Sequence, residues 1–364
     1  MKSNGRRTAL FWMTLHFFAL NFGATASGGK REPVNSTMQV NAAVYCRDAT
    51  RVAFGRQDGT VEVWDTASLR QISLLNCEQP VAAIAMDSKG DKLVVACVSD
   101  ASTCFVFKRV GNAYAPDRQL QFAKVPRKPE LDSFDAVAFS PDDKWLACAS
   151  MNKIRLFDAR EFKLRKMLYE TGNGIADLAF SSDSSKLVTA GQTLRTWDLK
   201  RANLREDAED SENWPIIELQ KREEKFTGFK LGSWAVSTAI GADGASIFGA
   251  GVFERKDNGI PVRLTQFDLY SGRPIRTFAT GPMELTSIAV TSDRQLVAAG
   301  ERTGIIQIWK VENGFSFRNL KPGLGLVRQI AFCPSGQDIL IAGDKMTPEI
   351  WNYQTGQLKR RLMK

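Results

Sequence analysis

The sequence predicts an all-β protein built from seven copies of a four-stranded unit, and two observations support this prediction. A short apolar strand ending in Trp or Phe recurs seven times, and a pair of apolar strands joined by a polar turn recurs upstream of it. The 364 residues, 43% hydrophobic and 24% charged, are enough for a repeat array with a large core. A period in the forties indicates a repeat architecture.

Residues 1–26 have the pattern of a secretory signal peptide. Lys2, Arg6 and Arg7 form a basic start, residues 9–22 are largely apolar, and residues 24–26 (Ala-Thr-Ala) offer a cleavage site before Ser27. We therefore expect an exported protein that works in the periplasm, at the cell surface or outside the cell. The alternative is that residues 9–26 remain as a membrane anchor, although this stretch is shorter than the roughly 20 apolar residues that a span needs.

One histidine, His16, occurs in the chain, and it lies in that first segment. If residues 1–26 are removed, histidine general bases, Ser-His-Asp triads and imidazole metal sites are excluded from the remaining chain. The six cysteines include no Cys-x-x-Cys pair, so we do not expect a zinc site either. We assign no catalytic residue, no metal ligand and no cofactor from the sequence.

The number of repeats follows from the strand that ends in an aromatic residue. Its aromatic residues recur every 40 to 50 residues, apart from one interval of 70, and are Trp64, Phe107, Phe157, Trp197, Phe267, Trp309 and Trp351. After one period is subtracted, the long interval leaves too few residues for another repeat. We therefore expect an insertion at about residues 201–230 of the fourth repeat, with Trp214–Ile217 inside it as a candidate outer strand.

The strands within each repeat are short and rich in β-branched and aromatic residues. Polar turns such as residues 140–143 (Ser-Pro-Asp-Asp) join them, because Pro fixes φ and Asp holds turn backbone with its own side chain. Apolar residues often occupy successive strand positions, so both faces of each sheet should be covered. Sheets that stack face to face around an axis meet this requirement.

Two stretches, Gln57–Asp65 and the Phe-Ser-Pro-Asp turn at 139–142, resemble WD40 repeats. The resemblance implies a β-propeller of seven four-stranded blades around a central channel, which spans residues 36–364 after a short linker at 27–35. WD40 repeats commonly carry a Gly-His pair whose histidine joins a buried hydrogen-bond network with the blade's Asp and Trp. Without a histidine after His16, no blade here builds that network, and the repeats count as divergent.

The two ends of the repeat region predict how the ring closes. The region starts at an inner strand (39–46) and finishes at an outer one (357–362). We therefore expect the first blade to pack on the last without a shared strand.

The basic residues, 49 against 40 acidic ones, suggest a nucleic-acid partner at first sight. Many of them, such as Arg70, Lys163 and Arg276, fall on the expected outer strands, where charge discourages edge-to-edge aggregation. We therefore expect protein partners and no nucleic acid. A membrane is expected as a partner only if the first segment stays uncleaved.

Two of the cysteines, Cys97 and Cys104, flank a turn in the second repeat and form a candidate disulfide. The alternative is that they are buried small apolar residues, as cysteines in sheets often are. Cys148 lies within an apolar strand, and we expect it in the core.

Three long connections, at residues 124–132, 201–230 and 254–261, are candidate functional loops on a rigid scaffold. In WD40 topology the loops between blades share one face with those between the second and third strands. We therefore expect a binding surface on this face, at the channel mouth. Its candidate residues are Trp234, Gln79, Asp132, Asn173, Glu284, Arg328, Arg127 and Lys128. The alternative is that Trp234 packs within its blade and that the loops are tolerated insertions.

The function that we expect is that of an exported, non-catalytic scaffold for protein partners. One alternative is a propeller enzyme, hydrolase-like, lactonase-like or quinone-dependent, in which Asp132 or Glu284 would do acid–base work. Another is a binder of a small ligand or carbohydrate that uses Trp234 at the channel mouth. The fold alone does not decide between these functions.

Overall fold

In the described part of the chain, 28 strands form seven antiparallel sheets of four strands each. The structure is a computed structural model, and it describes residues 39–98, 103–120, 134–150, 153–169, 174–191, 194–199, 216–218, 235–240, 245–252, 262–280, 284–344 and 347–362. These residues belong to one compact unit, Asn35–Lys364. The expected signal segment and linker lie outside the described residues. No helix in the described ranges is long and apolar enough to cross a membrane.

The innermost strands of blades 1 to 7 are β1 (Val40–Tyr45), β5 (Val81–Met86), β9 (Phe134–Phe139), β13 (Ile175–Phe180), β17 (Ala235–Ile240), β21 (Leu285–Val290) and β25 (Val327–Phe332). The second strands are β2 (Arg51–Arg56), β6 (Lys92–Cys97), β10 (Trp145–Ser150), β14 (Lys186–Gly191), β18 (Ser246–Val252), β22 (Leu296–Glu301) and β26 (Asp338–Gly343).

The third strands are β3 (Thr60–Asp65), β7 (Cys104–Val110), β11 (Lys153–Asp158), β15 (Leu194–Asp198), β19 (Val262–Asp268), β23 (Ile306–Lys310) and β27 (Glu349–Asn352). The outer strands are β4 (Arg70–Asn76), β8 (Ala113–Leu120), β12 (Leu164–Tyr169), β16 (Ile216–Glu218), β20 (Pro274–Phe278), β24 (Ser316–Leu320) and β28 (Gln357–Arg361).

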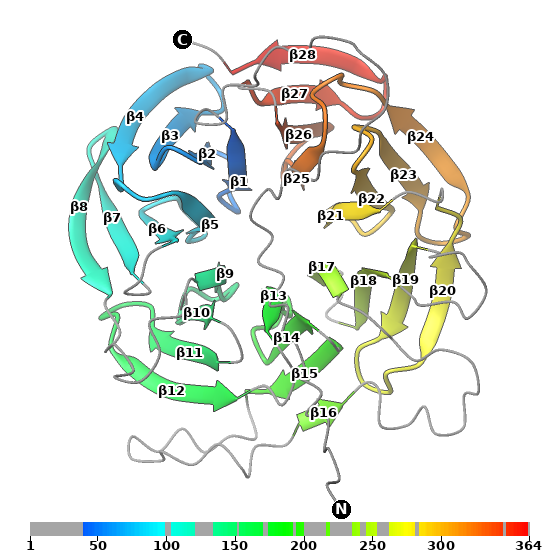
Figure 1. Cartoon of the computed structure of the whole chain (residues 1–364), viewed down its shortest axis with the longest axis horizontal. Coiled ribbons are helices and arrows are strands. Elements are labelled where there is room, and N and C mark those ends of the chain that lie inside the picture. The colour runs from blue at the N-terminus through cyan, green and yellow to red at the C-terminus, as the bar shows by residue number, and fades with distance from the viewer. Residues whose placement is uncertain are drawn as a thin grey trace, which may run out of the picture. The chain divides into compact units, whose positions relative to one another are not determined.

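Every sheet keeps the order of the sequence, because each strand pairs with the strand that follows it in its own blade. The blades succeed one another around a ring, with the first strand of each blade nearest the axis (Figure 1). Each inner strand contacts the inner strands of both neighbouring blades, including β1 with β25. The predicted all-β propeller of seven four-stranded blades is confirmed.

The ring closes as the sequence predicts, by packing of blade 1 on blade 7. The two blades are separate sheets, and one apolar cluster joins them. In this cluster Phe54 and Trp64 of blade 1 pack with Leu340 and Ile350 of blade 7. The closure therefore rests on apolar burial and not on a shared hydrogen-bonded strand.

Blade 4 has its outer strand inside the expected insertion. β16 pairs with β15, with Thr196 opposite Ile217. The strand begins at Ile216, two residues after the start of the predicted segment. The next described strand, β17, opens blade 5. The interval of 70 residues therefore holds an outer strand and not, within the described residues, a further sheet.

The successive apolar residues of the second strands serve two interfaces at once. On β10, Leu146 and Cys148 pack toward blade 2, whereas Ala147 and Ala149 pack toward blade 4. Alternate side chains of a strand point to opposite faces, so a strand between two blades needs apolar residues on both. Burial of one large side chain of this kind contributes about 1.5–3 kcal/mol.

The recurring aromatic residue marks a local irregularity. In six blades the pairing of the third strand with the outer strand shifts register at this residue: Trp64, Phe107, Phe157, Phe267, Trp309 and Trp351. Such a bulge adds twist to the sheet. The spacing of the aromatics in the sequence therefore reports a repeated feature of the outer hairpins.

Candidate functional site

A depression of about 230 Å³ lies where the inner strands of four blades end. Its lining includes the last residues of β1, β5 and β9, which are Tyr45, Met86 and Phe139. It also includes Pro334, which follows β25 in the turn of blade 7. The inner strands surround the channel axis (Figure 1), so the depression lies at one end of the channel. Its polar lining comes from Arg47, Ser88, Ser140 and Asp143.

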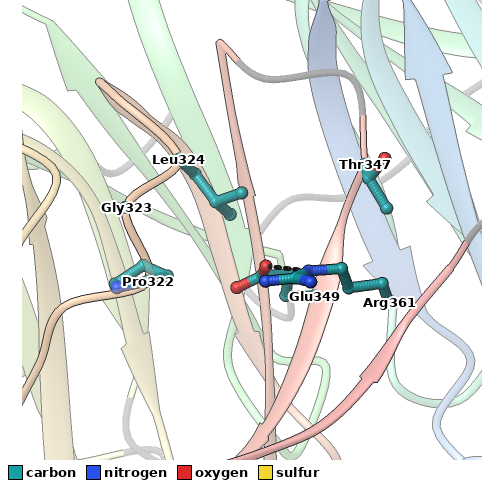
Figure 2. A pocket seen from close by; sticks show the side chains of 6 residues that line it. All are labelled: Pro322, Gly323, Leu324, Thr347, Glu349 and Arg361. Carbon is teal, nitrogen blue, oxygen red and sulfur yellow. Dashed lines mark hydrogen bonds and ion pairs between the residues drawn. The ribbon is translucent and has the colours of Figure 1, made fainter.

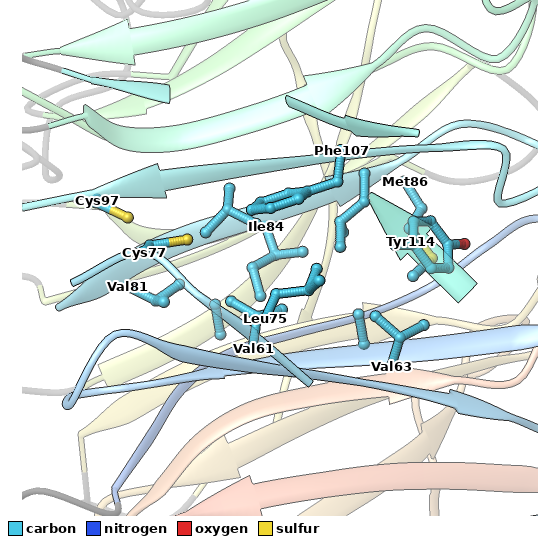
Figure 3. Packing of buried hydrophobic residues seen from close by; sticks show 14 of the residues in the cluster. Val61, Val63, Leu75, Cys77, Val81, Ile84, Met86, Cys97, Phe107 and Tyr114 are labelled. Atoms are coloured by element: carbon cyan, nitrogen blue, oxygen red, sulfur yellow. The ribbon is translucent and has the colours of Figure 1, made fainter. Parts of the chain in front are cut away.

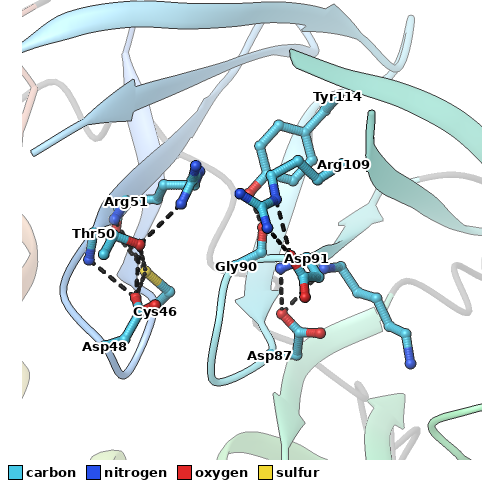
Figure 4. Close-up of polar contacts among 10 residues, drawn as sticks. Cys46, Asp48, Thr50, Arg51, Asp87, Gly90, Asp91, Arg109 and Tyr114 are labelled. Carbon is cyan, nitrogen blue, oxygen red and sulfur yellow. Dashed lines mark hydrogen bonds and ion pairs between the residues drawn. The ribbon is translucent and has the colours of Figure 1, made fainter. Parts of the chain in front are cut away.

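The same side-chain hydrogen bond recurs in five of the turns that follow the inner strands. The side chain of the first turn residue accepts a hydrogen bond from the backbone N–H that opens the second strand, as Figure 4 shows for two of the turns. The pairs are Cys46 with Arg51, Asp87 with Lys92, Ser140 with Trp145, Ser181 with Lys186, and Thr291 with Leu296, all at 2.9–3.0 Å. A small polar side chain here replaces a backbone acceptor and fixes the turn.

Neighbouring turns are also bonded to one another across blades. The backbone N–H of Asp48 in blade 1 donates to the carbonyl of Ser88 in blade 2 at 3.0 Å. The N–H of Ser88 donates to Asp143 of blade 3 at 2.9 Å, and its hydroxyl donates to the same carboxylate. The N–H of Asp142 donates to the hydroxyl of Ser184 in blade 4 at 3.0 Å. Four turns therefore form one connected rim.

Arg47 crosses this rim. Its Nη1 donates to the carbonyl oxygen of Pro141 at 2.6 Å, which joins blade 1 to blade 3 above the turn of blade 2. The side chain is exposed to solvent and lines the depression. A guanidinium carries five N–H donors in a planar fork, so Arg47 can bind a carboxylate or a carbonyl and keep its bond to Pro141.

Burial governs the ionisation of the groups around the depression. Desolvation raises the pKa of Asp87, the neighbouring carboxylates of Asp143 and Asp91 raise it further, and two backbone N–H groups oppose this shift. Burial likewise raises the pKa of the Tyr45 phenol, which therefore stays protonated. The lining combines one exposed cation, Arg47, with the carboxylate of Asp143 and two serine hydroxyl groups, next to the largely buried side chains of Met86 and Phe139. Chemically, it suits binding of a side chain next to an acidic group.

A second depression, of about 200 Å³, lies between the outer parts of blades 6 and 7. Figure 2 shows Glu349 and Arg361 facing the connection that contains Gly323. The Glu349 carboxylate is buried, and it accepts hydrogen bonds from Arg361 Nε at 2.9 Å and from Trp351 Nε1 at 2.8 Å. These contacts hold blade 7 together, so we assign this depression a structural role.

The predicted binding residues that the structure describes are Gln79, Glu284 and Arg328. They lie at the starts of the inner strands, at the opposite end of the channel from the first depression. Glu284 pairs with Arg302 at 3.2 Å, and Arg328 pairs with Asp344 at 2.7 Å.

Each of these ion pairs joins the start of an inner strand to the turn between the second and third strands of the same blade. The pairs tie Glu284 and Arg328 to separate blades, whereas Gln79 is exposed. No hydrogen bond or ion pair joins these three residues to one another within the described part of the chain.

The other predicted binding residues lie outside the described residues: Trp234, Asp132, Asn173, Arg127 and Lys128. The connections at 124–132 and 254–261 lie outside them as well, as does the connection at 201–230 apart from residues 216–218. The surface that they were expected to form stays a prediction.

The structure contradicts the candidate Cys97–Cys104 disulfide. Both residues are buried free thiols, and Cys104 stands opposite Ala96 in the strand pairing, so Cys97 points to the other face of the sheet. Cys97 belongs to the apolar cluster between blades 1 and 2, and Cys104 belongs to the one between blades 2 and 3. The expected core position of Cys148 is confirmed. Among the described residues, no three Cys, Asp or Glu side chains group as metal ligands.

The rim residues Arg47, Ser88 and Asp143 were not among the predicted binding residues. The recurring polar turn was visible in the sequence, but it indicated only hairpins. Recognition of the rim requires knowing that the turns of successive blades meet, which the ring alone decides.

Comparison with known proteins gives partial matches. The family model "WD domain, G-beta repeat" matches residues 132–158. The chain is similar to Protein HIR1 of Candida albicans, with 26% identity over 174 residues, which is 43% of this chain and 17% of that protein. It is also similar to Pre-mRNA-processing factor 17 of Homo sapiens, with 38% identity over 89 residues, which is 22% of this chain and 15% of that protein. The matched region therefore spans less than a fifth of the length of either relative.

Proposed function

We propose that this chain, which is a divergent WD40-repeat β-propeller, acts as a non-catalytic scaffold that binds other proteins. The observation that carries the proposal is the connected rim of turns in blades 1 to 4 around the first depression. Because these turns are already held by hydrogen bonds, a partner that docks on them loses little binding energy to ordering. Rigid surfaces with an exposed arginine beside aromatic residues are typical of interaction sites.

The depression indicates what part of a partner it would take. Its volume of about 230 Å³ is smaller than the cavities that enclose drug-sized ligands, and it suits a single side chain. We infer that the partner inserts an apolar side chain against Met86 and Phe139 and places a neighbouring carboxylate on Arg47. The occupant is thus an acidic, partly apolar segment of another protein.

The same proposal includes export. It is supported by the basic start, the apolar stretch and the small residues of segment 1–26. The mass of the chain purified from its own host with a C-terminal tag tests this part. A chain that begins at Ser27 agrees with cleavage and export, whereas an intact start favours the anchor formed by residues 9–26.

Binding is tested on the full chain with Arg47→Ala. A partner captured from the host and cross-linked to the rim should bind this variant at least about tenfold more weakly, because an interfacial charge pair is lost. Arg160→Ala removes an exposed arginine from the turn between β11 and β12 and should bind as the wild type does. Equal affinity of the Arg47 variant and the wild type would exclude the rim as the binding face.

The alternatives have separate readouts. Quenching of tryptophan fluorescence by a panel of sugars, lost in Trp234→Ala, would favour a carbohydrate binder. Turnover of an ester or lactone that is lost in Asp132→Asn or Glu284→Gln would favour an enzyme. Neither result is expected for a scaffold.

A further inference from the structure

We propose that Cys77 and Cys97 form a disulfide bond that joins blade 1 to blade 2 when the protein meets a disulfide oxidant. Cys77 directly follows β4, the outer strand of blade 1, and Cys97 ends β6, the second strand of blade 2. Figure 3 shows the two side chains next to one another in the apolar cluster between these blades, and their thiols are hydrogen-bonded. The structure thus replaces the pairing that the sequence suggested.

The backbone on both sides is already held in place. The N–H of Cys77 donates to the carbonyl of Gly59 at 3.0 Å, and the N–H of Cys97 donates to the carbonyl of Thr103 at 3.3 Å. Both side chains are almost fully buried, at 2% and 0% exposure. The hydrogen bond between the two thiols places them side by side on this fixed backbone, and a bridge requires two cysteines whose Cβ atoms lie close together.

The reaction is a thiol–disulfide exchange with a small-molecule disulfide such as oxidised glutathione. One protein thiolate attacks the oxidant, which forms a mixed disulfide and releases one reduced glutathione. The second thiolate attacks the protein sulfur of that mixed disulfide and releases the second reduced glutathione. Two protons leave the protein, two electrons pass to the oxidant, and one S–S bond forms.

The surroundings of the pair predict slow oxidation of the folded protein. A hydrogen bond with Cys77 and burial both raise the pKa of Cys97 well above its ordinary value, so little thiolate is present at neutral pH. The bond should form faster as the pH rises, and faster still when the protein refolds in the presence of the oxidant. The inference does not depend on the proposed scaffold function, because the oxidant is added to purified protein.

The test is peptide mapping of the purified full chain after refolding with oxidised glutathione. Free thiols are blocked with N-ethylmaleimide in denaturant, and the digest is analysed by mass spectrometry. We expect two peptides joined through Cys77 and Cys97, two hydrogen atoms lighter than their sum and separated by a reductant. Because the bond constrains the unfolded chain, Tm should rise by roughly 5 °C.

Variants check the pairing. Cys77→Ala should abolish the joined peptides, whereas Cys148→Ala, which removes a thiol from the next cluster, should retain them. The proposal would be overturned if N-ethylmaleimide modified both Cys77 and Cys97 in the oxidised wild-type protein. A joined peptide that links either residue to a different cysteine would overturn it as well.

Discussion

Trp64 donates its indole N–H to the carboxylate of Glu62, two residues earlier on the same strand, at 3.1 Å. Arg56 holds the other oxygen of that carboxylate at 2.8 Å. Residues two apart on a strand share one face, so the carboxylate reaches the indole without any change in backbone. A buried indole N–H needs an acceptor, and Glu62 supplies one in a chain whose only histidine is His16.

In blades 7 and 4 the indole N–H of the tryptophan also has an acceptor within its own blade. Trp351 donates to Glu349 at 2.8 Å in the same two-residue relationship. Trp197 donates instead to the hydroxyl of Thr189 on the adjacent strand at 3.2 Å. In blades 1, 4 and 7 an acceptor other than histidine therefore lies next to the tryptophan of the third strand.

Replacement of Glu349 by alanine should lower the free energy of unfolding by about 2 kcal/mol, because it leaves the indole N–H of Trp351 without its acceptor. Urea denaturation measures this difference. Glu312→Ala removes an exposed carboxylate and should change stability by less than about 0.5 kcal/mol. A loss at position 349 no larger than in this control would show that the hydrogen bond between Glu349 and Trp351 contributes little.

Gly304→Ala should destabilise the protein more than Gly323→Ala. Both glycines have positive φ, so each alanine costs about 1–2 kcal/mol in backbone conformation. A Cβ at Gly304 would also lie 2.4 Å from the carbonyl oxygen of Gly325, whereas a Cβ at Gly323 meets open space. Thermal unfolding of the two variants separates the contact from the backbone effect. Equal Tm values would refute the close approach.

Acid should destabilise the fold below about pH 4. Hydrogen bonds from Ser68 hold the pKa of Asp65 below its ordinary value of 3.8, and backbone N–H groups of Glu161 and Arg160 do the same for Asp158. A lowered pKa in the folded state gives stability that is complete above the unfolded value and is lost as the pH falls through the folded one. Tm measured from pH 6 to pH 2 should therefore fall in the acid range.

Asp158→Asn checks the cause of this dependence. The amide oxygen can still accept from Arg160 and Glu161, but the side chain no longer titrates. The variant should show a shallower fall of Tm below about pH 4 than the wild type. An unchanged slope would assign the acid sensitivity to other groups.

Asp143→Ala should loosen the rim at the end of the channel. The carboxylate accepts the N–H of Ser88 from the neighbouring blade, and its loss should speed amide exchange at Ser88 about tenfold, as expected for a bond worth about 1.4 kcal/mol. Asp143→Asn keeps an acceptor in place and should retain most of the protection. Hydrogen exchange followed by mass spectrometry distinguishes the two variants. Identical protection in both would mean that the turns are held without this contact.

The blades were predictable because each is a local pattern. Strand, polar turn and aromatic strand lie within about 40 consecutive residues, and the ring closure follows from which strand comes first and which comes last. The outer strand of blade 4 was placed two residues early, because a three-residue strand in a charged segment has too little pattern to define its ends. Most residues of the predicted binding surface lie outside the described ranges, and that surface stays a prediction.

The sequence by itself determined the number of blades, their four-stranded form and the apolar faces between them, since these depend on residues close together in the chain. The tertiary structure alone decided which distant residues meet. Arg47, Ser88 and Asp143 share a rim because three turns converge when the sheets close into a ring. Cys97 faces Cys77 and not Cys104, because alternate positions of a pleated strand point to opposite neighbouring blades.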